Sequence, residues 1–393
     1  MGNIQELFLN TIGIFNESFP PIMDGVALTT QNYAYWLHKK NIPVCVVTPK
    51  APNYSENEPF PVYRYTSLPL LGRKPYRLGL PDIDLALKTE LNQTPFGLVH
   101  AHSPFSSGRL ALQIAKKRKI PLVATFHSKY RDDFQRAVQN KLIAKQMLKQ
   151  IMPFFDKADE VWIPQASVEE TIREYGYKGK LIVVDNGNDF STDEPIEPMQ
   201  RTAREKFNVA DHEMFLLFVG QHIWEKNTRL IVESLAMIRD LPFKMFFVGI
   251  GYAQSDLMQL VDKLDLNEKV RFDGLITDRN ELKQYFAAAD LFLFPSIYDN
   301  APLVVREAGA LYTPSVLVRG SSAADIVTDN FNGFLTENSV DSFATKLREL
   351  MSQPEIVKNA GVQASKTIAR SWENVTEEVL DRYKNLIQRK WHK

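Results

Sequence analysis

Short apolar runs alternate along this chain with stretches in which apolar residues recur every three to four positions. The runs are as long as buried strands, and the spaced stretches have the period of a helix with one apolar face. This alternation is typical of βα units built around a parallel sheet. In the first half of the chain, strands are predicted at residues 7–15, 44–48, 98–101, 122–126, 160–163 and 181–184.

The alternation stops once and then begins again. Residues 191–199 are rich in proline and acidic side chains and have no periodicity, which indicates a linker between two domains. A chain of 393 residues also exceeds what one hydrophobic core usually serves. We therefore expect an α/β protein with two Rossmann-like, doubly wound domains that face a central cleft. Further strands are predicted at 215–220, 245–249, 270–272, 291–294 and 315–318. The expected parts are a first domain at 1–190, a linker at 191–203, a second domain at 204–370 and a terminal helix at 371–393 that returns to the first domain.

Composition narrows the possible partners. Lys plus Arg and Asp plus Glu both count 47, so the net charge is zero and no global field favours nucleic acid. The lone cysteine, Cys45, lies in an apolar run and is predicted to be buried, which fits a reducing cytosol. No apolar run approaches the ~18 residues that span a bilayer, and no signal peptide is evident. We expect a cytoplasmic protein that at most lies on the inner face of a membrane.

Two carboxylates in the second half point most directly to function. The apolar run 291–294 predicts a buried strand, and Pro302 with the residues after it predicts the first turn of a helix. Asp299 then lies in the turn, and Glu307 lies inside the helix. Backbone N–H groups at a helix N-terminus bind phosphates, while carboxylates accept hydrogen bonds from sugar hydroxyls. A nucleotide sugar carries both kinds of group.

Other polar side chains follow predicted strands, where open α/β sheets bind ligands. Lys226 lies in a polar loop after strand 215–220 and is suited to a diphosphate leaving group, although a loop lysine is often simply solvated. His102 and His127 follow two strands of the first half and are candidates for contact with a sugar, a phosphate or the acceptor. A buried structural role is their alternative, and a metal site is disfavoured because the ligand spacing is wrong.

Two glycine patterns have competing interpretations. Gly25 follows the first strand, where it lets the backbone approach a ligand or simply forms a tight turn. Gly249 and Gly251 begin a dinucleotide fingerprint, but Gln254 stands in place of its third glycine, which disfavours nicotinamide binding.

Basic side chains gather in two segments of the first half. One is the loop with Arg73 and Arg77, and the other is a helix predicted at 135–155, which carries several lysines beside apolar residues. Both segments could meet an anionic membrane or an acceptor, and the alternative is a solvated surface.

These motifs together resemble the retaining GT-B glycosyltransferases of family 4, also called glycosyl transferases group 1, over nearly the whole chain. The E-x7-E pattern of that family falls on Asp299 and Glu307, and its G-R-x4-K loop falls on Gly220 to Lys226. The segments 304–309 and 319–325 further resemble a bacterial subgroup labelled diacylglycerol-glucosyltransferase-like. The resemblance implies His102, Lys226 and Asp299 as catalytic residues. It implies donor contacts by Gly25, Gln221, Lys226, Gly274, Ile276, Asp299, Asn300, Ala301, Leu303 and Glu307, with Asp325 in the donor loop, and acceptor-side candidates Asp24, His127, Arg73 and Arg77.

Two residues depart from the family pattern. Gln221 stands where arginine is usual, which removes one positive charge from the diphosphate site, and Asp299 is one methylene shorter than the usual glutamate. The resemblance implies a retaining transfer of a hexose from a nucleotide-diphosphate sugar, with UDP favoured, to a hydroxyl of a glycan or glycolipid. It implies no cofactor and no metal. A nucleotide-sugar epimerase, a non-catalytic nucleotide-sugar-binding protein and a glycan phosphorylase are the alternatives.

Overall fold

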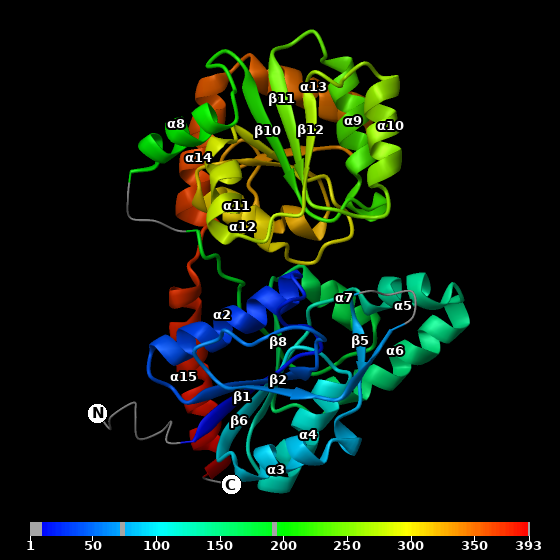
Figure 1. The fold of residues 1–393 in the computed structure, drawn as a ribbon, viewed down its shortest axis with the longest axis vertical. Coiled ribbons are helices and arrows are strands. Elements are labelled where there is room, and N and C mark those ends of the chain that lie inside the picture. The colour runs from blue at the N-terminus through cyan, green and yellow to red at the C-terminus, as the bar shows by residue number, and fades with distance from the viewer. Residues whose placement is uncertain (1–9, 71–74, 191–194, 392–393) are drawn as a thin grey trace. The chain divides into compact units, whose positions relative to one another are not determined.

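The computed structural model describes residues 10–70, 75–190 and 195–391. The chain forms two compact units: residues up to Asn186 together with those from Trp372 onward, and Gly187–Ser371. Each unit is a parallel sheet flanked by helices (Figure 1).

The first unit is built on a sheet of seven parallel strands in the order β3-β2-β1-β6-β7-β8-β9. The chain moves outward from β1 in one direction and from β6 in the other, so the gap between these neighbours is the topological switch point. The strands are β1 Thr11–Phe15, β2 Val44–Pro49, β3 Val62–Tyr65, β6 Phe96–Ala101, β7 Leu122–Thr125, β8 Glu160–Ile163 and β9 Leu181–Val183, and a separate antiparallel pair consists of β4 Ser67–Pro69 and β5 Arg77–Gly79.

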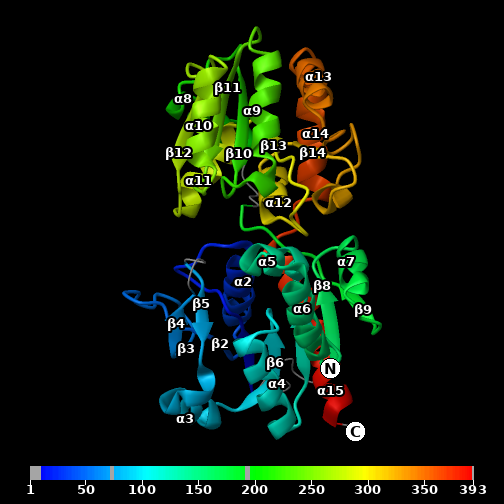
Figure 2. The ribbon, with the colours of Figure 1, turned by 90° about the vertical axis from the view of Figure 1, so that its right-hand side faces the viewer.

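Helices cover both faces of this sheet. The C-terminal helix α15 packs beside α2 on one face, and α4 packs on the other (Figures 1 and 2). The helices of this unit are α2 Gly25–Lys39, the short η1 Pro81–Ile83, α3 Leu85–Gln93, α4 Ser106–Arg118, α5 Tyr130–Val138, α6 Lys141–Phe155, α7 Val168–Glu174 and α15 Trp372–Trp391.

The second unit repeats the plan with six parallel strands in the order β12-β11-β10-β13-β14-β15. Its switch point lies between β10 and β13. Figure 1 shows α9 and α10 on one side of this sheet and α8 and α11 on the other. The strands are β10 Met214–Val219, β11 Phe243–Val248, β12 Val270–Gly274, β13 Leu291–Leu293, β14 Ser315–Val318 and β15 Phe334–Thr336. The helices are α8 Ile196–Lys206, η2 Trp224–Lys226, α9 Thr228–Met237, α10 Gln254–Lys263, α11 Arg279–Ala288, α12 Leu303–Ala310, η3 Ser322–Ile326, α13 Val340–Met351 and α14 Pro354–Thr367.

The apolar runs are the central strands. Every residue of β2 and of β6 is buried, as expected for strands covered on both faces. The short strands β3 and β15 were not predicted, because they lie at the sheet edges and their runs are short and partly exposed. The pair β4–β5 was also missed.

Two other predictions were wrong in detail. The linker predicted at 191–203 is helical from Ile196, where α8 begins, and Ile196 and Ala203 are buried. The single helix predicted at 135–155 is two helices, because Gln139 adopts a left-handed conformation and the Asn140 side chain then caps α6.

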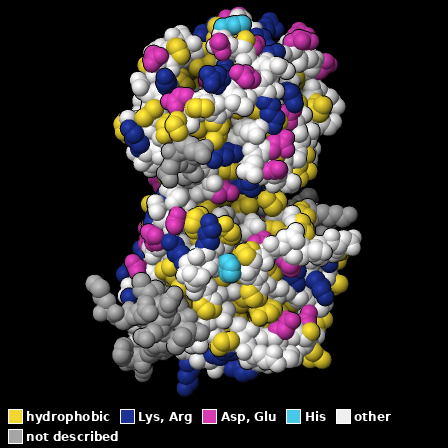
Figure 3. All heavy atoms as spheres, turned by 60° about the vertical axis from the view of Figure 1, so that its left-hand side comes forward, with side chains coloured by type: hydrophobic (Ala, Val, Ile, Leu, Met, Phe, Trp, Pro, Cys, Tyr) yellow, Lys and Arg dark blue, Asp and Glu magenta, His cyan; other side chains and the backbone are white. Residues whose placement is uncertain are grey.

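Side chains of both charge signs are interspersed on the face drawn in Figure 3, as the zero net charge leads one to expect. No helix among the described residues combines the length and the apolar character that crossing a membrane requires.

Candidate functional site

The switch point of the second unit brings together two residues that are far apart in sequence. Lys226 lies at the end of the loop after β10, and Asp299 lies in the loop after β13. The Lys226 Nζ and Asp299 Oδ1 atoms are 2.5 Å apart, with 13% and 18% of the two side chains exposed. Ser296 Oγ donates to the other Asp299 oxygen at 2.5 Å. The ammonium group of Lys226 is therefore fixed in position by its ion pair with Asp299 and is not freely solvated.

Glu307 has a different partner. It lies in α12, is 2% exposed, and its Oε1 accepts a hydrogen bond from Arg279 Nη2 at 2.5 Å. Burial raises the pKa of Glu307 and outweighs the lowering by Arg279. The two carboxylates of the sequence motif thus differ: Asp299 is paired with a lysine beyond the carboxyl ends of the central strands, and the buried Glu307 is paired with an arginine of α11.

The remaining donor-side candidates of the second unit lie in its loops and at the ends of its elements. Asn300 and Ala301 are in the turn before α12, and no side chain caps this helix at Pro302, so its N-terminus suits an anion. Gly274 ends β12 with a left-handed φ of 72°, Ile276 is half-buried, and Gln221 is exposed. Leu303 begins α12, and Asp325 lies in η3.

The glycines of the partial dinucleotide fingerprint have a structural explanation. A Cβ at Gly249 would lie 2.0 Å from the Gly220 carbonyl oxygen, and a Cβ at Gly251 would lie 2.2 Å from that of His222. The loops after β10 and β11 therefore touch backbone to backbone, which requires glycine at these positions. Gly249 also has a φ of 130°.

The first unit holds a buried cluster of histidines after β6 and β7. His102 is 1% exposed; its Nδ1 lies 2.9 Å from His127 Nε2, while its Nε2 is buried without a hydrogen-bond partner. Burial lowers the pKa of His102 well below its usual range and that of His127 to about 3. The neighbouring His100 contacts Tyr383 of α15. A neutral imidazole with one unused nitrogen can hydrogen-bond a substrate hydroxyl. Among the described residues, no group of three His, Cys, Asp or Glu side chains could hold a metal ion.

Two of the acceptor-side candidates, Asp24 and Arg77, are engaged in local hydrogen bonds. Asp24 is the N-cap of α2, where its Oδ1 accepts from the backbone N–H groups of Val26 and Ala27. Arg77 donates to Ser67 within the β4–β5 pair. Arg73 lies outside the described residues. Gly25 begins α2, and a Cβ there would meet nothing within 4 Å, so space is open beside it.

Glu17, which was not predicted, lies at the switch point of the first unit. It follows β1 and accepts hydrogen bonds from Ser107 N at 2.8 Å and from Ser106 Oγ at 2.9 Å, at the first turn of α4. Burial raises the pKa of Glu17, against the lowering by these bonds. Its partners are about ninety positions away, so no local pattern marks it.

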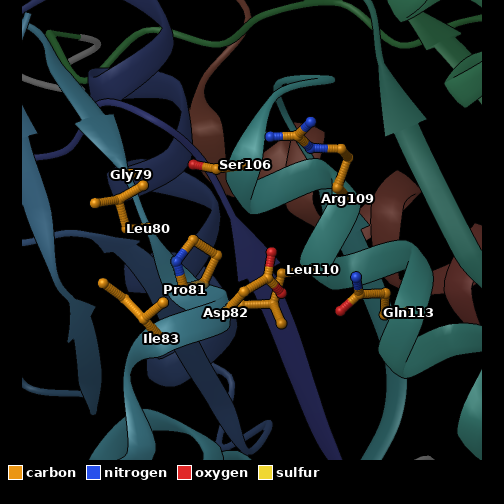
Figure 4. A pocket seen from close by; sticks show the side chains of 9 residues that line it. All are labelled: Gly79, Leu80, Pro81, Asp82, Ile83, Ser106, Arg109, Leu110 and Gln113. Atoms are coloured by element: carbon orange, nitrogen blue, oxygen red, sulfur yellow. The ribbon is translucent and has the colours of Figure 1, made fainter.

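A pocket of about 350 Å³ lies between α4 and the segment from the end of β5 through η1. Figure 4 shows the side chains that line it. Its polar lining includes Asp82, Arg109 and Gln113. Ser106 lines this pocket and also donates a hydrogen bond to Glu17, which follows the central strand β1. The apolar lining consists of Leu80, Pro81, Ile83 and Leu110.

Two family descriptions match most of the chain. Residues 23–192 match Glycosyltransferase Family 4, and residues 199–367 match Glycosyl transferases group 1. The chain belongs to these glycosyltransferase families. The predicted architecture of two Rossmann-like domains with parallel sheets is confirmed.

Similar proteins agree with this family. Alpha-monoglucosyldiacylglycerol synthase of Streptococcus pneumoniae is 25% identical over 96% of this chain and 86% of its own length. The synthase of the same name from Acholeplasma laidlawii is also 25% identical, over 96% of this chain and all of its own. The sucrose-phosphate synthase structure from Thermosynechococcus elongatus has a TM-score of 0.80 at 19% identity, covering 97% of this chain and 100% of that one.

This glycosyltransferase therefore moves a sugar from a nucleotide sugar, as predicted. Neither family description nor these relatives support the epimerase alternative. Sequence reasoning missed Arg279, Ser296 and Glu17. A local signal existed for two of them: Ser296 lies three residues before Asp299 of the carboxylate motif, and Arg279 follows the helix-capping Asp278 at the start of α11. Glu17 had none, because its partners are about ninety positions away.

Proposed function

We propose that this glycosyltransferase binds a UDP-sugar in its second unit and transfers the hexose, with retention of configuration, to a hydroxyl of a diacylglycerol-type lipid. The observation that carries the proposal is the Lys226–Asp299 pair at the switch point beside the uncapped N-terminus of α12. An ammonium and free helix N–H groups stabilise the charge that develops on a departing diphosphate.

The residues around the pair divide the donor between them. Lys226 binds the diphosphate, with Gln221 adding a neutral contact, and Asp299 accepts from sugar hydroxyls. Glu307 binds the ribose. The backbone of Asn300, Ala301 and Leu303 faces the phosphates, and Gly274 and Ile276 hold the base. UDP is favoured because the similar Anabaena protein HepE has been solved with UDP-glucose, with a TM-score of 0.75 at 18% identity over 95% of this chain and 99% of that one.

The first unit supplies the acceptor side. His102 offers its unused Nε2 to the sugar or the acceptor hydroxyl, and His127 holds the opposite nitrogen. Open space beside Gly25 leaves room for a ligand of the first unit. No metal or other cofactor is needed in this scheme, since Lys226 and the helix N-terminus supply the positive charge.

A lipid acceptor places the enzyme at a membrane surface, where a cytoplasmic protein would bind peripherally. Leu142 and Ile143 at the start of α6 are 80% and 50% exposed, next to Lys141 and Lys145. Apolar side chains beside cations favour an anionic bilayer. Ile83, which lines the pocket of Figure 4, is also exposed, as are the nearby residues in sequence Leu68, Leu78 and Leu85.

Donor binding is tested by calorimetric titration with UDP, GDP and ADP. Wild type is expected to bind UDP, and Glu307→Ala to lose that binding, whereas the exposed control Glu355→Ala keeps it. If no nucleotide binds, or Glu307→Ala binds like wild type, the donor site is wrongly placed.

The acceptor is tested with UDP-glucose and vesicles that contain diacylglycerol and phosphatidylglycerol. A glycosylated lipid is the expected product. Leu142→Glu with Ile143→Glu should reduce co-sedimentation with the vesicles, and Met237→Glu, an exposed position in the second unit, should not. Transfer to soluble glycans but not to the lipid would refute the proposed acceptor.

A further inference from the structure

Arg279 bridges two acidic side chains. It is the first residue of α11, and its guanidinium contacts two carboxylates from different parts of the chain. Nη2 lies 2.5 Å from Glu307 Oε1 and 2.5 Å from Asp189 Oδ1, and Nε lies 3.0 Å from Asp189 Oδ2. The guanidinium also lies over the Phe190 ring at 4.3 Å.

Asp189 and Phe190 lie at the start of the second unit, in the connecting segment by which the chain enters it from the first unit. The next residue toward the N-terminus, Asn188, is bonded to the other connecting segment: its backbone N–H and its side-chain amide both donate to the Arg370 carbonyl at 2.9 Å. The Asn188 Oδ1 accepts from Phe190 N at 2.9 Å. Hydrogen bonds between Asn188 and Arg370 thus join the two ends of the second unit, and Arg279 binds to the first of these ends through Asp189.

The positive charge of Arg279 stabilises the ionised form of the Glu307 carboxyl. Glu307 is 2% exposed, and the charged groups that act on it are Arg279 of α11 and Asp189. Burial and Asp189 favour the neutral acid, and Arg279 opposes them. Burial lowers the pKa of Arg279, but the two carboxylates raise it by more, so the guanidinium stays protonated. Without this cation, a buried carboxylate takes up a proton.

We infer that Arg279 is a positioning residue of the donor site, which pairs with Glu307, orients it for the nucleotide ribose and ties it to the connecting segment at Asp189. This inference rests on the proposed function, in which Glu307 binds the donor. Nucleotide binding and the order of the segment 187–190 are then coupled through one side chain.

The test measures UDP binding by calorimetry between about pH 5.5 and 9 on wild type, Arg279→Gln and Arg279→Lys. Arg279→Gln should raise Kd for UDP by about tenfold or more at neutral pH, since Glu307 then lacks the cation that orients it and opposes its protonation, and Kd should fall again as the pH rises. Arg279→Lys should recover much of the affinity. The control Arg348→Gln breaks an exposed pair with Asp240 and should bind like wild type.

Hydrogen exchange supplies a second readout. UDP should protect the amides of residues 188–190 in wild type, and Asp189→Asn and Arg279→Lys should lose that protection, because lysine reaches only one of the two carboxylates. Should Arg279→Gln not fold, the exchange data on these two variants decide. The inference is overturned if Arg279→Gln binds UDP as tightly as wild type or more tightly, or if Arg279→Lys keeps the wild-type protection of residues 188–190. Either result leaves the proposed donor site intact. Failure of wild type to bind any nucleotide refutes the proposed function itself.

Discussion

Acid is expected to destabilise the first unit through His100. This residue is fully buried, with Nδ1 2.6 Å from the Tyr383 hydroxyl and Nε2 2.7 Å from Thr125 Oγ1. Burial, and secondarily the charge of His127, lowers the pKa of His100 well below its usual range. The folded protein therefore keeps this imidazole neutral at a pH at which the unfolded chain protonates it.

The sign and size of the effect follow from linkage. Below about pH 6.5 the unfolded chain binds more protons than the folded one, so stability is fully present above that pH and decreases as the pH falls. Going from about pH 7.5 to 5 costs about 2 kcal/mol for His100 alone. That is a large share of the 5–15 kcal/mol typical of folded domains. His102 and His127 act in the same direction.

Urea unfolding at a series of pH values measures this loss. Trp162 stacks on Tyr383 next to His100, with ring centroids 5.6 Å apart, so the contribution of this one of the five tryptophans to the fluorescence reports on this region. His100→Gln keeps a donor and an acceptor but does not titrate. The variant should be less stable than wild type at neutral pH. Below about pH 6, however, its free energy of unfolding should decrease less steeply with falling pH than that of wild type, by about 1.4 kcal/mol per pH unit. Parallel losses in the two proteins would refute the reasoning.

Three further changes test the fold. Tyr383→Phe removes the hydroxyl that bonds His100 and should cost about 1 kcal/mol in urea unfolding, leaving α15 attached; a loss of α15 by proteolysis would contradict this. Gly249→Ala places a Cβ against the Gly220 carbonyl at a strained φ and should cost on the order of 3 kcal/mol, seen as a lower Tm; an unchanged Tm would disprove the close backbone contact. Asp24→Ala removes the cap of α2 and should cost about 1 kcal/mol by denaturant titration, while Asp24→Ser should restore most of it.

The sequence went a long way toward the fold because its main signals are local. Apolar runs gave the central strands of both sheets, and the spacing at Asp299 and Glu307 indicated a strand, a turn and a helix. Edge strands such as β15 and the break at Gln139 were missed, since burial on one side only and a single left-handed residue leave weak traces in a pattern.

What the sequence alone determined was therefore a two-domain glycosyltransferase with its polar groups at strand ends. Only the tertiary structure decided the partners of those groups. The pairing of Lys226 with Asp299 joins residues 73 positions apart, and that of Arg279 with Asp189 joins residues 90 apart. The sheet order brings the first pair to one switch point, and helix packing brings the second together. Such contacts depend on how whole elements are arranged, and no short stretch of sequence specifies that arrangement.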